Sequence, residues 1–266
     1  MKYSVIIRCY NTLPLIKKCV EAVIQSTDFD TEIILINNHP PYNEVAQYLA
    51  NISHPRIIIL DPGKNIGNLE GFNYGANYAK GENLIILDDD IIVPNNNWID
   101  NMSQSLDDFP NLGYVSLMAK HIELFIFNNN EQLKNEIINM KDYSILITEH
   151  MVIFGCVMLK KDLWERYFSK IKLEIMVLYD IDFFYKMEAE KNGLDAGYIV
   201  SHLADHLGRS EESDFAYGMW KVLYVYGLVF EDYGKWRKDK KNITSMEEEV
   251  LIKFGYTKEQ INNFSI

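Results

Sequence analysis

The first hundred residues alternate between short strand-like runs and segments of helical apolar spacing, and this alternation constrains the fold more than any other feature. The strand-like runs, of the kind buried on both faces of a sheet, lie at 4–7, 32–36, 56–60 and 84–87. The helical sets between them are Ile16, Val20, Val23 and Ile24, then Val45, Tyr48 and Leu49, then Leu69, Phe72, Ala76 and Ala79, followed by Gly81 as the helix end. Short connections between such elements predict a parallel sheet with right-handed crossovers.

The second half of the chain is less regular. Its patterns predict helices at 98–106, 163–171 and 182–189, and strands at 114–119, 152–159 and 198–203. Residues 121–150 look like an insertion, and the aromatic-rich tail from Ala216 has helical spacing. No linker is long enough to separate independent domains, so we expect one α/β domain with a helical tail.

Charge excludes one large class of partner. The chain has 266 residues, with 38 Asp and Glu against 26 Lys and Arg, for a net charge of -12. Such a balance repels nucleic-acid phosphates, and no basic stretch is long enough to override it, so we expect no nucleic-acid partner. An acidic protein still binds a phosphorylated small molecule where a divalent cation bridges the like charges.

The cysteine pattern and the length of the apolar stretches indicate the cellular compartment. Cys9, Cys19 and Cys156 are scattered without metal-ligand spacing, which is typical of buried thiols in a reducing environment. The first residues enter a strand-like run without a signal peptide's apolar region. The longest apolar stretches, 151–159 and 222–230, reach about half the length of a membrane-spanning helix. We therefore expect a soluble, cytoplasmic protein.

Three consecutive carboxylates, Asp88, Asp89 and Asp90, follow the strand predicted at 84–87. Open α/β sheets bind their ligands at this end of their strands. Crowded carboxylates repel one another, and a divalent cation relieves the repulsion by taking oxygen ligands. In an extended segment Asp88 and Asp90 point the same way, so both can hold one metal ion while Asp89 points elsewhere. A solvated acidic turn is the alternative, and the apolar residues on both sides of the triplet argue against it.

The segment Asn65-Ile66-Gly67-Asn68 precedes the third predicted helix, and Asn73 lies on the second turn of that helix. A glycine after a turn lets backbone approach a ligand, and a helix N-terminus favours a phosphate. Ordinary turn chemistry, with Asn68 as a helix cap, is the alternative. The acidic triplet downstream favours the ligand site.

A second acidic segment contains Asp180 and Asp182 beside large aromatic residues, which makes them candidates for a general base with a raised pKa. Alternatively Asp182 caps the following helix and Asp180 is solvated, and one can cap while the other reacts. His206, close to Arg209, is a candidate metal ligand or phosphate contact. A lone histidine is more often structural.

Taken in order, these motifs resemble the inverting family 2 glycosyltransferases of the GT-A fold, over roughly residues 3–210. Residues 5–11 are similar to the family's opening strand and Tyr-Asn turn, and 32–38 to the second strand, whose end contacts the nucleotide base. Asn65, Gly67 and Asn73 match an Asn-X-Gly motif and a helical Asn. Gly81-Glu82 and Asp88-Asp89-Asp90 match a Gly-acid turn and the DXD metal motif. Gly155 begins a segment that resembles the acceptor-side strand, residues 179–182 resemble the catalytic acidic segment, and His206 falls where the family often has a histidine near the diphosphate.

The resemblance implies a GT-A, Rossmann-like, mostly parallel sheet flanked by helices. The domain would span 1–215, with a nucleotide-binding half at 1–95 and an acceptor half at 96–215, and a helical C-terminal extension would cover 216–266. The implied reaction moves a hexose-type sugar from a nucleotide-diphosphate sugar, with UDP as the expected nucleotide, to a hydroxyl of a glycan or lipid-linked acceptor, with inversion. Mn²⁺ or Mg²⁺ is the implied cofactor.

The resemblance also assigns residues to roles. Asp180 is the implied catalytic base with Asp182 as its rival, and Asp88, Asp90 and His206 are the implied metal ligands. The implied contacts to the nucleotide and its phosphates are Cys9, Tyr10, Asn11, Asn37, Asn38, Asn65, Gly67, Asn73, Asp88, Asp89 and Arg209. Two positions depart from the family's pattern. Asn37-Asn38 stands where an Asp is usual, so the base contact would be an amide, and Tyr179 stands where Glu usually precedes the catalytic Asp.

Two other functions compete with sugar transfer. A sugar-phosphate nucleotidyltransferase also pairs an α/β sheet with carboxylate-bound Mg²⁺, but its Gly-rich loop after the first strand is missing from residues 9–14. A GT-A-like module that binds nucleotide or glycan without turnover is the other alternative. The aromatic tail from Ala216 fits core packing best, and stacking on sugars, a homodimer contact and peripheral membrane association are its other roles.

Overall fold

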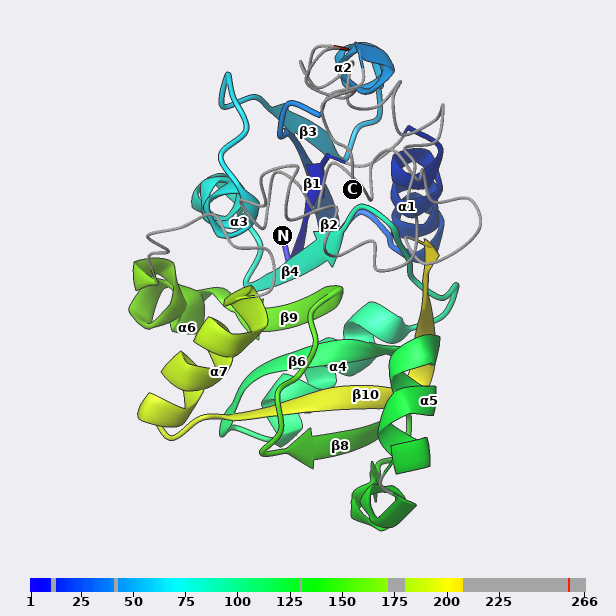
Figure 1. Cartoon of the computed structure of the whole chain (residues 1–266), viewed down its shortest axis with the longest axis vertical. Helices are drawn as coiled ribbons and strands as arrows, with labels where there is room; N and C mark the ends of the chain where they lie inside the picture. Colours follow the sequence, from blue (N-terminus) through cyan, green and yellow to red (C-terminus); the bar gives the residue numbers. More distant parts are fainter. Residues whose placement is uncertain (11–12, 41–42, 130, 172–179, 208–257, 259–266) are drawn as a thin grey trace.

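The computed structural model describes residues 1–10, 13–40, 43–129, 131–171, 180–207 and 258. Within these residues a mixed, mostly parallel sheet lies between two layers of helices (Figure 1). The strand order is β3-β2-β1-β4-β9-β6-β10-β8-β7, and the short strand β5 pairs with β10 off this path. The predicted fold class is confirmed.

The first half of the sheet is a parallel unit that follows the predicted alternation. Its strands are β1 (Tyr3–Cys9), β2 (Thr31–Asn37), β3 (Ile57–Leu60) and β4 (Asn83–Asp88), and these four run parallel to one another. Its helices are α1 (Leu13–Ser26), α2 (Asn43–Asn51) and α3 (Asn68–Tyr78). From β1 the chain builds outward to β2 and β3 and then returns to place β4 on the other side of β1. The sheet therefore has a topological switch point between β1 and β4, where ligands of such folds bind.

The second half extends the sheet with strands of both directions. Its strands are β5 (Ile91–Ile92), β6 (Leu112–Ala119), β7 (Ile138–Asn139), β8 (Ser144–Thr148), β9 (Cys156–Lys160) and β10 (Asp195–His206). Its helices are α4 (Trp98–Asp108), α5 (Lys120–Asn129), η1 (Glu131–Glu136), α6 (Lys161–Arg166), η2 (Phe168–Lys170) and α7 (Asp180–Lys191). The strand β9 runs antiparallel to both β4 and β6, and β8 runs antiparallel to β10. The expected insertion at 121–150 thus supplies a helix and the strands at one edge of the sheet.

Alternate residues of the central strands enter two separate apolar cores. Val5 and Ile7 of β1 pack with α1, α2 and α4, whereas Ile6 packs with α3, α6 and α7 on the other face. Both faces of the sheet are therefore covered by helices, which is why the strands read as continuous apolar runs. None of the helices in the described ranges combines the length and the apolar character needed to cross a bilayer.

Some predicted boundaries are wrong. The helix α3 ends at Tyr78 with Ala79 as its C-cap, so Gly81 does not end it. Gly81 instead lies against β1, where an added Cβ would stand 2.6 Å from the backbone nitrogen of Ser4. The strand predicted from residue 152 begins at Cys156. The helical tail from Ala216 lies outside the described residues.

Candidate active site

The acidic triplet lies at the switch point of the sheet. Asp88 is the last residue of β4, and it pairs in register with Arg8 of β1. Arg8 Nη2 donates to Asp88 Oδ1 at 2.5 Å, and the arginine side chain is largely buried. The backbone nitrogen of Asp88 donates to the carbonyl of Gly155 at 2.9 Å. One negative charge of the triplet is thus balanced by an internal cation that the sequence analysis gave no role.

Asp89 and Asp90 are both buried, and each is held by a different segment. Asp89 Oδ2 accepts a hydrogen bond from the backbone nitrogen of Tyr10 at 2.6 Å, which fixes the turn after β1. Asp90 Oδ2 lies 3.3 Å from His206 Nε2, and the carbonyl of Asp90 accepts from the backbone nitrogen of Leu207 at 2.8 Å. The triplet is therefore preorganised by β1 on one side and by the end of β10 on the other.

Two of the three expected metal ligands are adjacent. Asp90 and His206 are in contact, while Asp88 is paired with Arg8. No group of three His, Cys, Asp or Glu side chains within the described ranges forms a metal cage. A carboxylate beside an imidazole is nevertheless a donor pair that suits Mn²⁺. His121, which the sequence analysis left without a role, has its ring centroid 5.1 Å from that of His206.

The loop before α3 is held by the end of β2. Asn38 Oδ1 accepts from the backbone nitrogen of Ile66 at 3.0 Å, and its Nδ2 donates to the carbonyl of Gly67 at 3.2 Å. Asn65 Oδ1 accepts from the nitrogen of Gly67 at 2.8 Å. Gly67 has φ +84° and is the N-cap, so the alternative in which Asn68 caps the helix is wrong. A left-handed backbone explains why glycine is needed there.

Other expected nucleotide contacts are buried or already bonded. The side chain of Cys9 is fully buried, and burial raises the pKa of its thiol, so the thiol is not accessible to a ligand. Asn73 Oδ1 accepts from Trp164 Nε1 at 3.2 Å, a packing contact between α3 and α6. Asn37 Nδ2 donates to Asp61 Oδ2 at 2.9 Å. Asn11 and Arg209 lie outside the described residues.

The second acidic segment begins α7. Because the helix starts at Asp180, Asp182 lies within the first turn, and its predicted role as the N-cap is wrong. Asp182 Oδ2 accepts from the backbone nitrogen of Phe154 at 3.2 Å. Burial raises the pKa of Asp182 to about 7, the negative charge of Asp88 adds to the rise, and the Phe154 hydrogen bond opposes it. The side chain of Asp180 lies outside the described part of the chain.

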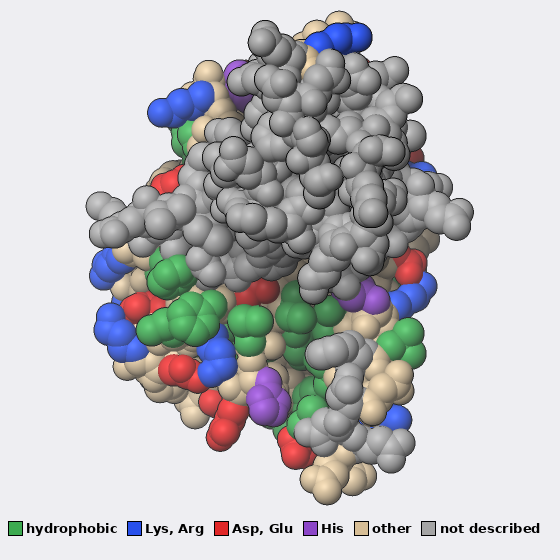
Figure 2. All heavy atoms as spheres, in the orientation of Figure 1, with side chains coloured by type: hydrophobic (Ala, Val, Ile, Leu, Met, Phe, Trp, Pro, Cys, Tyr) green, Lys and Arg blue, Asp and Glu red, His purple; other side chains and the backbone are tan. Residues whose placement is uncertain are grey.

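Hydrophobic side chains lie at the surface over α7 (Figure 2). Phe183 and Met187 of this helix are each about half exposed. Phe183 follows Asp182 in the chain and turns its ring to the surface. Exposed aromatic rings of this kind offer a stacking surface to the apolar face of a sugar.

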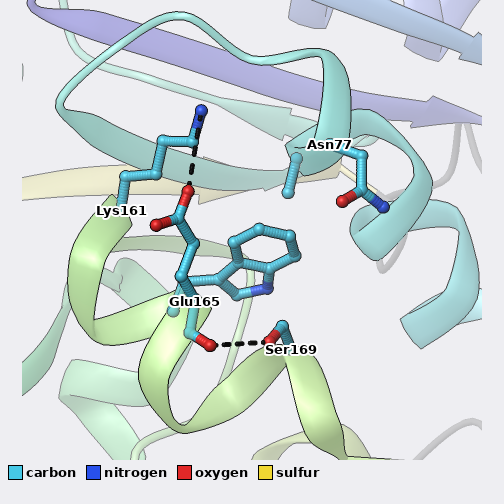
Figure 3. A pocket seen from close by; sticks show the side chains of 6 residues that line it. Asn77, Lys161, Glu165 and Ser169 are labelled. Atoms are coloured by element: carbon cyan, nitrogen blue, oxygen red, sulfur yellow. Dashed lines mark hydrogen bonds and ion pairs between the residues drawn. The ribbon is translucent and has the colours of Figure 1, made fainter.

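A pocket elsewhere on the molecule is separate from this edge (Figure 3). It lies between the last turn of α3 and α6, whereas Gly67 begins α3 at the opposite end of that helix. Its polar groups bind one another, since Lys161 pairs with Glu165 and Ser169 Oγ donates to the carbonyl of Glu165. We assign no catalytic role to it.

Comparison with known proteins identifies the family. The sequence pattern that defines glycosyl transferase family 2 matches residues 4–168, which is more than half of the chain. The chain belongs to glycosyl transferase family 2. The matched range contains the loop before α3 and the acidic triplet, while the acidic segment at the start of α7 lies beyond it.

Proteins that are similar to this chain agree with this family. A glycosyltransferase of Bacillus subtilis strain 168, YwdF, is 27% identical over 131 residues, which cover 49% of this chain and 42% of that protein. The chain thus spans less than half the length of this curated relative. The mannosyltransferase PcManGT of Pyrobaculum calidifontis, solved with GDP-Man and Mn²⁺, has a TM-score of 0.61 at 17% identity, covering 96% of this chain and 69% of that one. GalNAc-T7, solved with UDP, GalNAc and Mn²⁺, has a TM-score of 0.60 at 13% identity, and the match covers 77% of this chain and 44% of that one. These structures show that the fold is that of GT-A glycosyltransferases.

Proposed function

We propose that this protein is a metal-dependent inverting glycosyltransferase of the hexosyltransferase type. It would move a sugar from a nucleotide-diphosphate sugar, with UDP as the nucleotide, to a hydroxyl of a glycan or lipid-linked acceptor. One observation carries the proposal. Asp182 Oδ2 accepts from the backbone nitrogen of Phe154 at 3.2 Å, and the carbonyl of the next residue, Gly155, accepts from the backbone nitrogen of Asp88 at 2.9 Å. A donor-binding group and a candidate base therefore share one edge of the sheet.

The donor would bind at the triplet. Asp90 and His206 would hold Mn²⁺ or Mg²⁺, with Asp88 and Asp89 beside them. A bound cation neutralises the negative charge that develops on the departing diphosphate. Support comes from two proteins of the same fold, since PcManGT was solved with GDP-Man and Mn²⁺ and GalNAc-T7 with UDP, GalNAc and Mn²⁺.

The acceptor would be activated from the α7 side, by Asp180 or Asp182. A carboxyl with a pKa near the working pH is a good general base, and the pKa of about 7 supports Asp182. The resemblance to the family's acidic segment supports Asp180. The base takes the proton of the acceptor hydroxyl as its oxygen bonds to the anomeric carbon. The bond from that carbon to the diphosphate breaks on the opposite face, so the configuration inverts. The exposed ring of Phe183 is available to position the acceptor sugar.

A donor panel tests this proposal against its rivals. The purified chain is incubated with UDP-, GDP-, CDP- and ADP-sugars, with Mn²⁺ or with a chelator, and free nucleoside diphosphate is measured. We expect UDP to be released from a UDP-sugar with Mn²⁺ and not with the chelator. A nucleotidyltransferase would instead release pyrophosphate from a nucleoside triphosphate and a sugar phosphate. A binding module would be stabilised by a nucleotide and would release nothing, even when glycan and lipid-linked acceptors are added.

A further inference from the structure

The three residues before β9, Ile153, Phe154 and Gly155, connect two parts of the candidate active site, and we call them the bridging segment. They lie outside the helices and strands and lead into β9, which neighbours β4 and β6 in the sheet (Figure 1). The backbone nitrogen of Phe154 donates to Asp182 Oδ2 of α7 at 3.2 Å. The carbonyl of Gly155 accepts from the backbone nitrogen of Asp88 at 2.9 Å. The bridging segment therefore joins the start of α7 to the end of β4.

Two buried hydroxyl groups bind the backbone at the first residue of this segment. The backbone nitrogen of Ile153 donates to Tyr198 Oη at 2.6 Å, and the carbonyl of Ile153 accepts from Ser116 Oγ at 3.1 Å. Ser116 Oγ also lies within hydrogen-bond distance of the carbonyls of Cys156, at 3.3 Å, and Leu117, at 3.4 Å, so the carbonyl of Ile153 is the closest of the three. Both backbone polar groups of Ile153 are thus bonded to side chains. The sequence analysis gave neither Tyr198 nor Ser116 a role.

The sheet register explains why both hydroxyls reach the same residue. Tyr198 of β10 pairs with Ser116 of β6, and paired residues of neighbouring strands point to the same face of a sheet. Both residues are fully buried. A buried hydroxyl is costly unless it is hydrogen-bonded, and so is a buried backbone group without a β-ladder partner. The contacts between Ile153 and the two hydroxyls satisfy both requirements at once.

Aromatic packing fixes the side chain at the centre of the segment. The ring of Phe154 lies edge-on to the ring of Tyr114, with the centroids 5.6 Å apart, and to that of Tyr185 in α7, with the centroids 5.0 Å apart. The hydroxyls of Tyr114 and Tyr185 are buried and have no hydrogen-bond partner within the described residues. Tyr198 differs from both, because its hydroxyl binds the backbone of the bridging segment.

We propose that Tyr198 and Ser116 are positioning residues of the transfer reaction, which hold the bridging segment through Ile153 and thereby fix the start of α7 relative to the end of β4. The inference rests on the proposed function and adds two residues that act through this backbone. A displacement of reacting groups by about 1 Å can slow a reaction about 10²-fold. Asp180 and Asp182 lie in the first turn of the same helix, so the two hydroxyls position whichever of them is the base.

The kinetics of Tyr198→Phe and Ser116→Ala test this role. Wild type and variants are incubated with Mn²⁺, the acceptors of the donor panel, and UDP-glucose, UDP-galactose or their N-acetylated forms, and the rate of UDP release is measured. UDP affinity is measured by calorimetric titration, and Tm by thermal unfolding. In both variants we expect kcat to fall about ten- to hundredfold, because the candidate base is displaced. UDP affinity should equal that of wild type, because β4 stays paired with β9 and keeps Asp88 in place.

Two other buried tyrosines provide matched controls. Tyr114→Phe removes a hydroxyl that has no partner in the described part of the chain, so kcat and Tm should equal those of wild type. Tyr143→Phe removes a hydrogen bond of 2.7 Å to Asp108 Oδ2, in the core on the other face of the sheet from Tyr198. The Tm of this variant should fall while its kcat stays at the wild-type value. Tyr143→Phe therefore separates a loss of stability from a loss of positioning.

Each outcome decides for or against the positioning role. A lower kcat at unchanged UDP affinity in Tyr198→Phe and Ser116→Ala, with both controls at the wild-type rate, supports it. A wild-type kcat in both variants overturns it and leaves the proposed function standing. An equal loss of kcat in Tyr143→Phe also overturns it, because the rate would then follow stability. If Tyr198→Phe does not fold, Ser116→Ala, which keeps the bond from Ile153 to Tyr198, decides alone. If wild type releases UDP from none of these sugars, the proposed function fails and the positioning role fails with it.

Discussion

Asp182 offers a test of the site that does not depend on knowing the substrate. Its carboxylate is buried at the start of α7, accepts one hydrogen bond from Phe154, and has a pKa of about 7 in place of its usual 3.8. Replacing it by Asn keeps an oxygen that can accept from Phe154 but removes the ionisation. The buried amide hydrogens of Asn bring a cost of their own, and that cost is independent of pH. The difference in the free energy of unfolding between wild type and Asp182→Asn therefore changes with pH only through the charge of Asp182.

The sign and the size of this pH dependence follow from the number of protons bound by the folded and the unfolded chain. Between pH 4 and pH 7 the unfolded chain has released this proton and the folded protein has kept it, so the free energy of unfolding falls as the pH rises. Each pKa unit is worth about 1.36 kcal/mol, so the full loss is about 4 kcal/mol, and about 3 kcal/mol of it falls between pH 5 and pH 8. The Asn variant does not lose this stability. For a chain of this size, Tm of wild type relative to the variant should fall by about 6–12 °C over that range.

The assay is thermal unfolding of wild type, Asp182→Asn and Asp162→Asn at several pH values from 5 to 8. Asp162 is exposed on α6, so its variant should follow wild type at every pH. As the pH rises, the Tm of wild type should fall steadily relative to the Tm of Asp182→Asn, and this difference should level off above pH 7. A gap that stays constant from pH 5 to pH 8 would refute the reasoning, because Asp182 would then titrate near its usual pKa.

Three further predictions concern donor and acceptor. Asp90→Ala should abolish Mn²⁺-dependent nucleotide binding with an unchanged circular dichroism spectrum, and binding equal to that of wild type would contradict the metal assignment. His206→Ala should weaken UDP more than uridine, and equal weakening of both would indicate a packing defect. Asp180→Asn should keep donor binding and slow transfer about 10²–10⁴-fold, the usual contribution of a general base. If Asp182→Asn slows transfer instead, the base is Asp182.

The elements of the first half could be predicted because both faces of the sheet are covered. The strand β2, in which every residue is buried, contains the continuous apolar run Ile33-Ile34-Leu35-Ile36, and a sequence shows such a run directly. The triplet was recognisable because charged residues directly after such a run must lie at the end of a buried strand. Element ends were harder to predict. Gly81 looked like a helix end, but its position reflects a close approach to β1 that sequence spacing does not reveal.

Asp61 shows a different limit. Asp61-Pro62-Gly63 reads as ordinary turn chemistry, and Asp61 does accept from the nitrogen of Gly63 as such a turn requires. The same carboxylate also accepts from Asn37 Nδ2, and Asn37 is 24 residues away in the chain. The contact between Asn37 and Asp61 can be predicted from the sheet topology. Once β2 and β3 are taken as parallel neighbours, residues that end the two strands become contact candidates. Arg8 is a similar case, since its partner Asp88 follows from the β1–β4 register.

Burial of a carboxylate does not by itself mark the active edge of this sheet. Glu32, in β2 near the amino ends of the strands, is as buried as Asp89 and Asp90, and its Oε1 accepts from Ser4 Oγ at 2.6 Å and from the backbone nitrogen of Lys80. These hydrogen bonds join β1, β2 and the segment after α3 at the amino edge of the sheet. At the carboxyl edge Asp89 accepts from the backbone nitrogen of Tyr10, which follows β1, and Asp90 contacts His206 at the end of β10. We therefore propose that a buried carboxylate of this fold is structural at the amino end of a strand and donor-binding at the carboxyl end.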